Sequence, residues 1–413
     1  MRFFEKINGT AVVFALLAFI IGWQAGHFDV NLQWKNYKPV FSFTNLQPPK
    51  EKKGIDFKLF WEVWDLVSKE YVDKKAIDAQ KMYYGAIQGM VAALGDPYTV
   101  FLPPEAQKST KEELGGSFEG VGIQLEFNKE KRLVVAAPLK DTPADKAGIK
   151  AGDIIVKIDD KDAGGISLPE AVKLIRGPKD TQVKLEIFRE GDTKTKEYTL
   201  KRAMIVVKSV EFEEKTTPQG KKISYIKLSR FGERTFTEWN ETVSQTLASG
   251  TEGVILDVRN NPGGFLDGAV FIGSEFIERV KVGSSDKVND IVLQEDQEGR
   301  RQAFKVNREG RLTKLPLVVL VNKGSASASE IVAGAIQDYK RGRLVGEQSF
   351  GKGTIQESQE LSGDTGIHIT TAKWLTPNGR WIHNTGLTPD IKAELDETEE
   401  KDEQLEKALE LLD

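Results

Sequence analysis

One serine-rich segment, from Asn322 to Ile331, has the composition and the position expected of a nucleophile. It follows the apolar run Leu317–Val321 and precedes a helical pattern, so Ser327 would lie beside the free backbone amides of a helix N-terminus. Such amides can stabilise an oxyanion. Ser327-x-x-Glu330 is equally a capping box, and by itself this segment favours a helix cap over a nucleophile.

A serine hydroxyl also needs a proton acceptor. Of the histidines, only His368 and His383 follow the serine, and neither has a recognisable aspartate partner. Lys352 is the better candidate, because Gly351 and Gly353 permit a close approach to another backbone. Burial can lower the pKa of an ammonium group by up to about 5 units, which leaves a neutral amine as the base. Without further context, an ordinary surface lysine in a glycine turn is the better interpretation.

The composition excludes several other kinds of site. The chain has no cysteine, which rules out disulfides, thiolate zinc sites, iron–sulfur clusters and a cysteine nucleophile. Its 3 histidines do not suit an imidazole metal site, since His27 lies far along the chain from the other two. We therefore expect no metal centre. Basic and acidic residues are scattered and give a net charge of -4, so nucleic acid is not expected as a partner.

Residues 1–27 are predicted to be a signal anchor. Arg2 and Lys6 precede an apolar run of about 16 residues, which is short for a membrane span and also compatible with a signal peptide. No clear small-x-small cleavage site follows, so we favour an uncleaved anchor in the bacterial cytoplasmic membrane. The catalytic part would then lie outside the cytoplasm, in the periplasm or cell envelope. Residues 28–55 carry three prolines and are interpreted as a linker.

Two further parts of the chain differ in their predicted secondary structure. Residues 56–114 are expected to be a helical segment, because apolar residues recur at helical spacing in Phe57–Glu70 and Ala79–Leu94. Residues 115–202 consist of short β-rich runs between glycine turns, with a helix that begins at Ser167. The second part is therefore expected to be a small sheet domain.

The remainder of the chain predicts a larger α/β core. Between residues 203 and 395, apolar strands such as Leu317–Val321 alternate with helices, a pattern typical of a sheet that is covered on both faces. The fold class is therefore α/β and α+β multidomain. Residues 396–413 are interpreted as an acidic helical tail with no assigned chemistry.

The block 115–202 resembles a PDZ domain through Gly120–Ile123, Pro143–Ile155 and the helix after Ser167. In this interpretation, consecutive backbone amides hold a peptide carboxylate, while a strand edge and the apolar stripe of the helix bind the rest of the peptide. The residues expected to bind peptide are Gly120, Val121, Gly122, Ile123, Leu168 and Val172. The alternative is that the glycines only make turns.

Further segments together resemble the carboxyl-terminal processing proteases, or tail-specific proteases. Lys352 follows Ser327 by 25 positions, and Gln356 comes four residues later. The other matching segments are Leu256–Gly264, Thr370–Gly379 and Thr385–Ile391. The resemblance runs from about Phe57 to Ile391 and implies a ClpP/crotonase-like α/β protease core with an inserted PDZ domain.

The resemblance also implies a role for each matching catalytic residue. Ser327 would attack the scissile carbonyl, and Lys352 would remove its proton and later protonate the leaving amine. Gln356 would orient Lys352, with a core amide as its alternative interpretation. No cofactor is implied.

Other residues are expected to support this chemistry. The resemblance implies that the oxyanion is held by the backbone amides of Ala328 and of Gly263 or Gly264. Arg176 stands at the end of the predicted groove helix, where it could bridge the PDZ domain and the protease core. We hypothesise that peptide binding helps to align the catalytic residues through Arg176, and a plain surface arginine is the alternative.

Together these features predict a serine endopeptidase that captures protein substrates by small or apolar carboxyl-terminal tails. The predicted partners are these substrates and, through the anchor, the membrane; a homo-oligomer or an adaptor protein is left open. The main alternative is a latent or inactive PDZ scaffold that binds tails at the membrane. A trypsin-like PDZ protease is disfavoured because the chain lacks a Gly-Asn-Ser-Gly-Gly motif, and a crotonase-type acyl-transfer enzyme is disfavoured by the PDZ block and Lys352.

Overall fold

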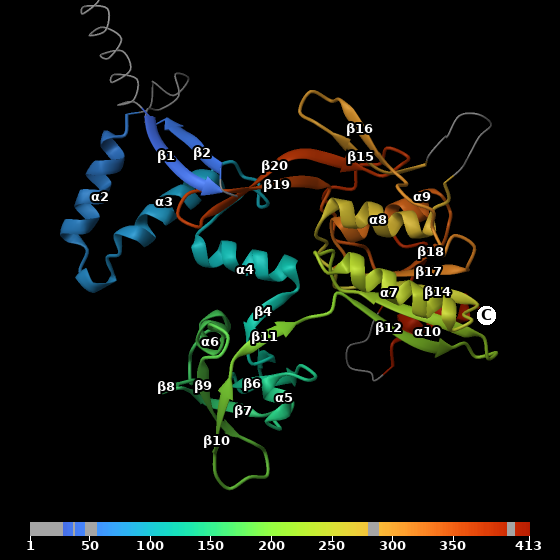
Figure 1. Ribbon diagram of the computed structural model, residues 1–413, viewed down its shortest axis with the longest axis horizontal. Helices are drawn as coiled ribbons and strands as arrows, with labels where there is room; N and C mark the ends of the chain where they lie inside the picture. Colours follow the sequence, from blue (N-terminus) through green and yellow to red (C-terminus); the bar gives the residue numbers. More distant parts are fainter. Residues whose placement is uncertain (1–27, 36–37, 46–55, 280–288, 395–400) are drawn as a thin grey trace, which may run out of the picture. The chain divides into compact units, whose positions relative to one another are not determined.

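The computed structural model of the chain describes residues 28–35, 38–45, 56–279, 289–394 and 401–413 (Figure 1). The chain divides into two compact units, residues 1–83 and 84–413. The predicted signal anchor, residues 1–27, lies outside the described residues. Within the described ranges, no helix is long and apolar enough to cross a membrane.

The first unit contains a β-hairpin where the sequence suggested only a linker. β1 (Phe28–Lys35) pairs antiparallel with β2 (Lys38–Asn45). The segment interpreted as a linker therefore includes a hairpin, and the sequence signal for it is the alternation of apolar and polar residues along β1 with the period of a strand. α2 (Lys58–Glu70) and the start of α3 (Ala79–Ala92) lie where helical spacing predicted helices.

The predicted PDZ domain is a sheet with two short helices. Its strands are β5 (Ile123–Phe127), β6 (Leu133–Pro138), β7 (Ile154–Ile158), β8 (Lys161–Asp162), β9 (Gln182–Phe188) and β10 (Lys196–Lys201). They run in the order β10-β9-β7-β6-β5, with β8 paired to β7, so β5 is an edge strand. α5 (Pro143–Lys146) and α6 (Leu168–Ile175) accompany the sheet.

A two-stranded stem joins the PDZ domain to the rest of the second unit. β4 (Ser117–Gly120) pairs antiparallel with β11 (Ala203–Val206), so the two ends of the inserted block lie next to each other. α4 (Pro104–Gly115) precedes the stem, and β3 (Val100–Leu102) precedes α4. This arrangement makes the PDZ domain an insertion rather than an extension.

The larger domain, which the sequence predicts to be the protease core, is built on a six-stranded sheet. Its strands, in spatial order, are β12 (Val210–Thr216), β13 (Lys222–Leu228), β14 (Gly253–Asp257), β17 (Leu317–Val321), β18 (Arg343–Gly346) and β21 (Ile391–Lys392). From β13 onward all neighbours are parallel. Parallel strands need crossover connections, and α7 (Thr235–Ala248), α8 (Leu266–Phe276) and α9 (Ala328–Asp338) supply them.

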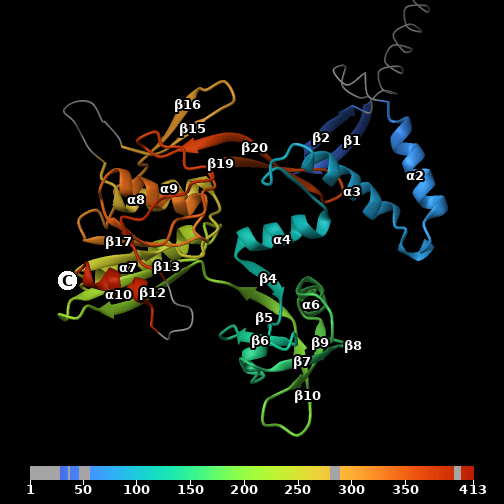
Figure 2. The same cartoon turned by 180° about the vertical axis from the view of Figure 1, so that it is seen from behind.

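Both faces of this sheet are covered (Figure 2). Val319 and Val321 pack with residues of α8 and α9, whereas Val318 and Leu320 pack with α10 (Glu403–Glu410). All five residues of β17 are buried, as the continuous apolar run predicted. The predicted fold class, α/β with a PDZ domain, is confirmed.

A second sheet carries residues of the active site. Its strands are β15 (Asp290–Glu295), β16 (Arg301–Lys305), β19 (Thr354–Glu360) and β20 (Gly366–Leu375), in the order β16-β15-β20-β19. β3 pairs with β20, which brings the segment before α4 onto the core.

Candidate active site

Ser327 lies in the sharp turn between β17 and α9. Its φ of 55° is in the left-handed region, which a serine adopts only when the surrounding structure holds it there. Two bonds hold this turn: Ser325 Oγ donates to the Val258 carbonyl (2.8 Å), and the Ala326 N–H donates to the Asn261 carbonyl (2.9 Å). The turn therefore presents Ser327 at the N-terminus of α9, as a nucleophile requires.

Glu330, fully buried in the first turn of α9, joins the two segments that carry the predicted nucleophile and base. Its carboxylate accepts hydrogen bonds from Ser327 N (2.8 Å), Ser349 Oγ (2.6 Å), Gly351 N (2.7 Å) and Lys352 N (2.9 Å). Burial raises the pKa of this carboxyl, although the four donors act in the opposite direction. The sequence identified Glu330 only as part of a cap, and its contact with the lysine segment depends on the fold.

Lys352 is half-buried just before β19. Burial lowers the pKa of its ammonium group, while the charges of Asp96 and Glu330 oppose this effect. Its Nζ lies 4.8 Å from the ring centroid of Tyr98, and its carbonyl oxygen accepts a hydrogen bond from Trp374 Nε1 (2.8 Å). A partly desolvated ammonium of this kind loses its proton more readily than an exposed one.

The two glycines beside Lys352 lie against other backbone, as the sequence predicted. Gly351 has a φ of +90°, and a Cβ there would lie 2.7 Å from the Gly386 nitrogen. A Cβ at Gly353 would lie 2.9 Å from the His383 nitrogen. Larger residues at either position would displace the lysine segment.

Gln356 lies on β19, next to a register shift in its pairing with β20. Its amide nitrogen donates to Thr354 Oγ1 (2.9 Å) and to Thr370 Oγ1 (3.0 Å). These threonines fix the direction of the amide, and Gln356 and Lys352 line the same cavity.

The Gly263–Gly264 turn packs directly on the nucleophile segment. A Cβ at Gly263, which has a φ of +100°, would lie 2.8 Å from Ser327 Cβ and 3.0 Å from the Ala328 nitrogen. The Gly263 N–H donates to Asn261 Oδ1 (2.9 Å). A Cβ at Gly264 would lie 2.1 Å from the Phe231 carbonyl oxygen. Both positions therefore require glycine.

All the predicted catalytic and oxyanion residues line one cavity of about 350 Å³. They are Ser327, Lys352, Gln356, Ala328, Gly263 and Gly264. Its apolar wall includes Leu266, Ile331, Ile355 and Trp374. The cavity can therefore hold an apolar side chain next to the serine.

The sequence analysis missed several residues of this cavity. Thr110, Glu113 and Leu114 of α4 line it, as does His368 of β20. Burial lowers the pKa of His368, and the positive charge of Lys352 acts in the same direction. Pro104 at the first position of α4 is a helix-start signal that could have revealed this element.

The predicted peptide-binding residues of the PDZ domain lie at one end of its sheet. Gly122 has a φ of +78°, and a Cβ there would lie 2.4 Å from the Thr142 side chain. Val121 precedes the edge strand β5, which begins at Ile123, and α6 carries Leu168 and Val172. α6 packs near β5, and this pairing of edge strand and helix is suited to strand addition by a peptide.

Arg176 caps α6 and contacts α4 rather than the core directly. Its Nη1 donates to Glu112 Oε2 (3.0 Å), and its guanidinium carbon lies 4.3 Å from the Phe118 ring centroid. α4 in turn contacts the core, where the Glu233 N–H donates to the Leu114 carbonyl (2.9 Å). Arg176 is therefore linked to the core by way of α4, and its role in coupling the two domains stays a prediction.

Comparisons with known proteins agree with this site. Residues 222–393 match peptidase family S41, residues 134–189 match a PDZ domain, and residues 20–106 match the N-terminal domain of the activating protease CtpB. The chain is 39% identical over 334 residues to the carboxy-terminal processing protease CtpA of Bacillus subtilis, across 81% of this chain and 68% of that protein. It is also 39% identical over 328 residues to the carboxyl-terminal-processing protease of Synechocystis, and this match covers 79% of this chain and 74% of that protein.

A solved structure shows the same similarity. The photosystem II D1 C-terminal processing protease is 31% identical with a TM-score of 0.50, and the match covers 85% of this chain and 96% of that one. The peptidase match, residues 222–393, includes the serine, lysine and glycine segments that meet in the cavity, and the PDZ match lies in the inserted block. The chain therefore belongs to the carboxy-terminal processing proteases, serine-type peptidases of family S41.

Proposed function

We propose that this protease cuts peptide bonds with a Ser327–Lys352 dyad supported by Gln356. The observation that carries the proposal is the convergence of all the predicted catalytic and oxyanion residues on one cavity, next to a lysine whose pKa is lowered by burial. A neutral Lys352 takes the proton of Ser327 Oγ as the oxygen attacks the scissile carbonyl. The lysine then gives this proton to the leaving amine, and water releases the acyl group in the second half of the reaction.

The oxyanion is assigned to the backbone N–H groups of Ala328 and Gly264. Ala328 is the first residue of α9, whose first N–H groups have no intrahelical acceptor. Gly264 is preferred over Gly263 because the Gly263 N–H already donates to Asn261 Oδ1. Loss of one such donor typically slows an enzyme by roughly 100-fold to 1000-fold.

Gln356 is assigned the role of orienting Lys352. Its amide is fixed by Thr354 and Thr370 on the wall that it shares with the lysine. Replacement of Gln356 would then lower kcat by allowing the amine to turn away from the serine.

The substrates are proposed to be proteins with small or apolar carboxyl-terminal tails. The turn at Gly120–Ile123 would hold the terminal carboxylate, the edge of β5 would add the tail as a strand, and Leu168 and Val172 would contact its side chains. Tail binding would reach the catalytic residues through Arg176 and α4, whose Thr110 and Leu114 line the cavity.

The enzyme is further proposed to be held at the bacterial cytoplasmic membrane by residues 1–27, with the catalytic part outside the cytoplasm. The supporting observation is the basic start and the apolar run of that segment. Fractionation of cells, followed by protease treatment of intact spheroplasts, tests both the anchoring and the orientation.

The decisive experiment compares the full chain with Ser327→Ala and Lys352→Ala. Each is incubated with an unfolded protein that ends in an apolar tail, and fragments are followed by mass spectrometry. Cleavage by the parent alone supports the dyad, and equal cleavage by all three rejects it. Binding of the tail without cleavage by the parent would favour the latent or inactive scaffold instead.

A further inference from the structure

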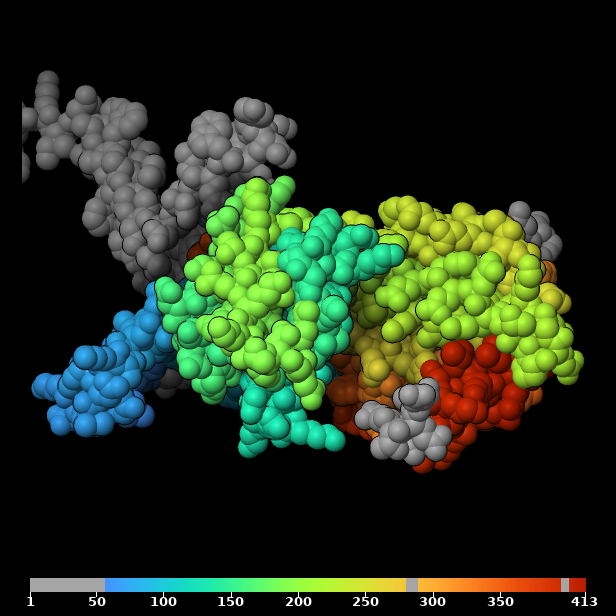
Figure 3. Space-filling model, turned by 90° about the horizontal axis from the view of Figure 1, so that it is seen from below, coloured from blue at the N-terminus to red at the C-terminus, as the bar shows by residue number. Residues whose placement is uncertain are grey.

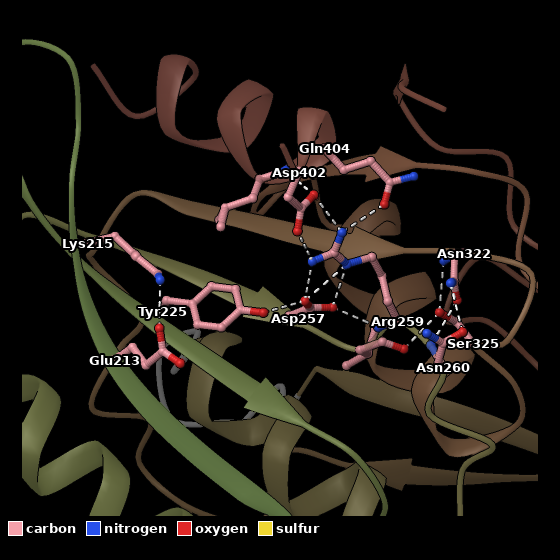
Figure 4. A network of polar contacts seen from close by, with 12 residues as sticks. Glu213, Lys215, Tyr225, Asp257, Arg259, Asn260, Asn322, Ser325, Asp402 and Gln404 are labelled. Carbon is pink, nitrogen blue, oxygen red and sulfur yellow. Dashed lines mark hydrogen bonds and ion pairs between the residues drawn. The ribbon is translucent and has the colours of Figure 1, made fainter. Parts of the chain in front are cut away.

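A buried ion-pair network connects the oxyanion turn to the carboxyl-terminal segment 401–413 (Figure 4). At its centre, Arg259 Nη1 donates to Asp402 Oδ1 (2.9 Å) and Gln404 Oε1 (3.0 Å), and Nη2 donates to Asp402 Oδ2 (2.8 Å). Nη2 and Nε also donate to Asp257, at 2.6 and 3.0 Å. A guanidinium has five N–H donors, and these contacts use all of them.

The network is shielded from water on the side of the core. The Arg259 side chain is 10% exposed and that of Asp257 is 3% exposed. Tyr225 OH donates to Asp257 Oδ2 (2.6 Å), which completes the shell around that carboxylate. In such a place the direction of Arg259 is set by its partners, because a displaced guanidinium would lose hydrogen bonds that water cannot replace.

Arg259 belongs to the loop that ends in the oxyanion turn. Its own N–H donates to Asp257 Oδ1 (2.9 Å) at the end of β14. Asn260 follows with a φ of 55°, and the buried Asn261 then accepts a hydrogen bond from the Gly263 N–H. Only three residues separate Arg259 from Gly263, so a shift of the arginine is transmitted to the turn.

The other side of this loop is held by the nucleophile segment. Asn260 N donates to Asn322 Oδ1 (2.8 Å), and Ser325 Oγ donates to the Val258 carbonyl (2.8 Å). Figure 4 shows the loop between these contacts and the carboxyl-terminal segment. The loop is therefore held by contacts on two sides. One set comes from the predicted nucleophile segment and the other from the carboxyl-terminal segment.

The carboxyl-terminal segment is itself firmly docked. Asp402 caps α10 by accepting from Leu405 N (3.0 Å), and Ala408 and Leu412 are buried against the sheet. Lys221 Nζ donates to the Leu412 carbonyl (3.2 Å), and Figure 3 shows the red end of the chain beside the yellow-green segment. The Asp402 carboxylate is thus presented to Arg259 by a fixed helix start.

We propose that Asp402 and Gln404 are positioning residues of the active site, which hold the loop Val258–Gly264 through Arg259 so that the oxyanion donor is aimed at the substrate. This proposal rests on the proposed roles of Ser327 and Gly264. It gives the acidic carboxyl-terminal segment a part in catalysis, although none of its residues touches the cavity.

Positioning and simple stabilisation lead to different kinetics. A loosened oxyanion turn weakens binding of the transition state but not of the substrate, so kcat falls while KM stays the same. A general loss of folded protein lowers the concentration of active enzyme and leaves the affinity for every inhibitor unchanged.

The test uses the purified full chain and its Asp402→Asn variant, with a quenched-fluorescence peptide copied from a site that the parent cleaves. Asparagine retains the cap of α10 and removes the charge that holds Arg259. The control is Glu406→Gln, which removes a carboxylate from the exposed side of the same helix. A peptide aldehyde of the same sequence, whose adduct with Ser327 carries an oxyanion, is compared with the matching alcohol, which forms no adduct.

For Asp402→Asn we expect kcat to fall by about tenfold or more and inhibition by the aldehyde to weaken to a similar degree. KM and inhibition by the alcohol should stay within about twofold of the parent, and Glu406→Gln should match the parent throughout. If Asp402→Asn fails to fold, Gln404→Leu serves as the second variant and carries the same expectation.

An unchanged kcat in the folded variant overturns the proposal, as does a parallel change for the aldehyde and the alcohol. Its failure is separable from that of the proposed function. If only the positioning role fails, Ser327→Ala is inactive and Asp402→Asn resembles the parent. If Ser327→Ala is active, both the proposed dyad and the positioning role are rejected.

Discussion

At the scale of single residues, the surroundings of Lys352 set the pH range in which the proposed base is neutral. Burial lowers the pKa of the ammonium group, and the negative charges of Asp96 and Glu330 raise it. Because only the neutral amine accepts the Ser327 proton, kcat/KM should rise as the pH increases through the pKa of Lys352 in the free enzyme.

Asp96→Asn should therefore move this rise to lower pH. The substitution removes a charge that stabilises the ammonium form, while asparagine can still accept the hydrogen bond from the Tyr98 N–H (3.0 Å). The measurement is kcat/KM against pH for parent and variant, with the exposed Asp160→Asn as control. A shift to higher pH, or no shift, would contradict the assignment of Lys352 as the base.

The Gly263 position allows a second test at this scale. Gly263→Ala should lower kcat by roughly 100-fold or more, because the new Cβ would lie 2.8 Å from Ser327 Cβ and displace the oxyanion turn. Gly152→Ala is the matched control: its φ is +85°, and a Cβ there would meet nothing within 4 Å. The control should lose about 1 kcal/mol of stability and keep its activity. Equal losses of activity would show that backbone strain alone is responsible.

At the scale of elements, α4 has contacts with both domains that only the fold could reveal. It lines the active-site cavity, it pairs with Arg176 of the PDZ domain, and Lys111 forms an ion pair with Glu360 of β19 (2.7 Å). A helix that contacts both the PDZ domain and the core can transmit peptide binding in the first to the active site in the second, provided that the helix has two alternative positions.

Arg176→Ala should lower the rate at which a protein substrate with an apolar tail is cleaved. The rate of cleavage of a short peptide without such a tail should stay unchanged. The arginine pairs with the mostly buried Glu112, whose side chain is 19% exposed, so its loss frees α6 from α4. Lys173→Ala is the control, since its ion pair with Glu105 joins the same helices through side chains that are 68% and 79% exposed. The measurement is the cleavage rate of each variant on the tailed protein and on the short peptide. If Arg176→Ala and Lys173→Ala change these two rates equally, Arg176 has no special role in coupling the domains.

The same elements show how far the sequence alone could lead. β17 could be predicted because its five residues are all apolar and all buried, and α6 because Ser167 caps a clear apolar stripe. Pro104 could have marked the start of α4, but the contacts of this helix with the cavity could not be predicted, since its residues are mostly polar and these contacts come from packing in the fold. Arg259 and Asp402 lie 143 positions apart, and among the many arginines and aspartates nothing in the sequence pairs these two.

At the scale of the whole molecule, the proposed function divides recognition and cleavage between two domains of one chain. The PDZ domain has its own core, which includes Val135, Ile158 and Leu185, and the protease core is centred on its six-stranded sheet. The stem of β4 and β11 joins them at both ends of the insertion. Under the proposed function, a substrate tail bound at the PDZ domain would raise the local concentration of the rest of that substrate near Ser327.

This division predicts that affinity follows the tail and not the cleaved sequence. A protein ending in three apolar residues should have a KM about tenfold or more below that of the same protein ending in three aspartates, because effective concentration depends on the tail bound at β5 and α6. Amidation of the apolar tail should raise KM as well, since the turn at Gly120–Ile123 would lose the carboxylate that it holds. Short peptides cut at the same bond should show no dependence on their ends. If kcat and KM are the same for all three proteins, the core selects its substrates without the PDZ domain.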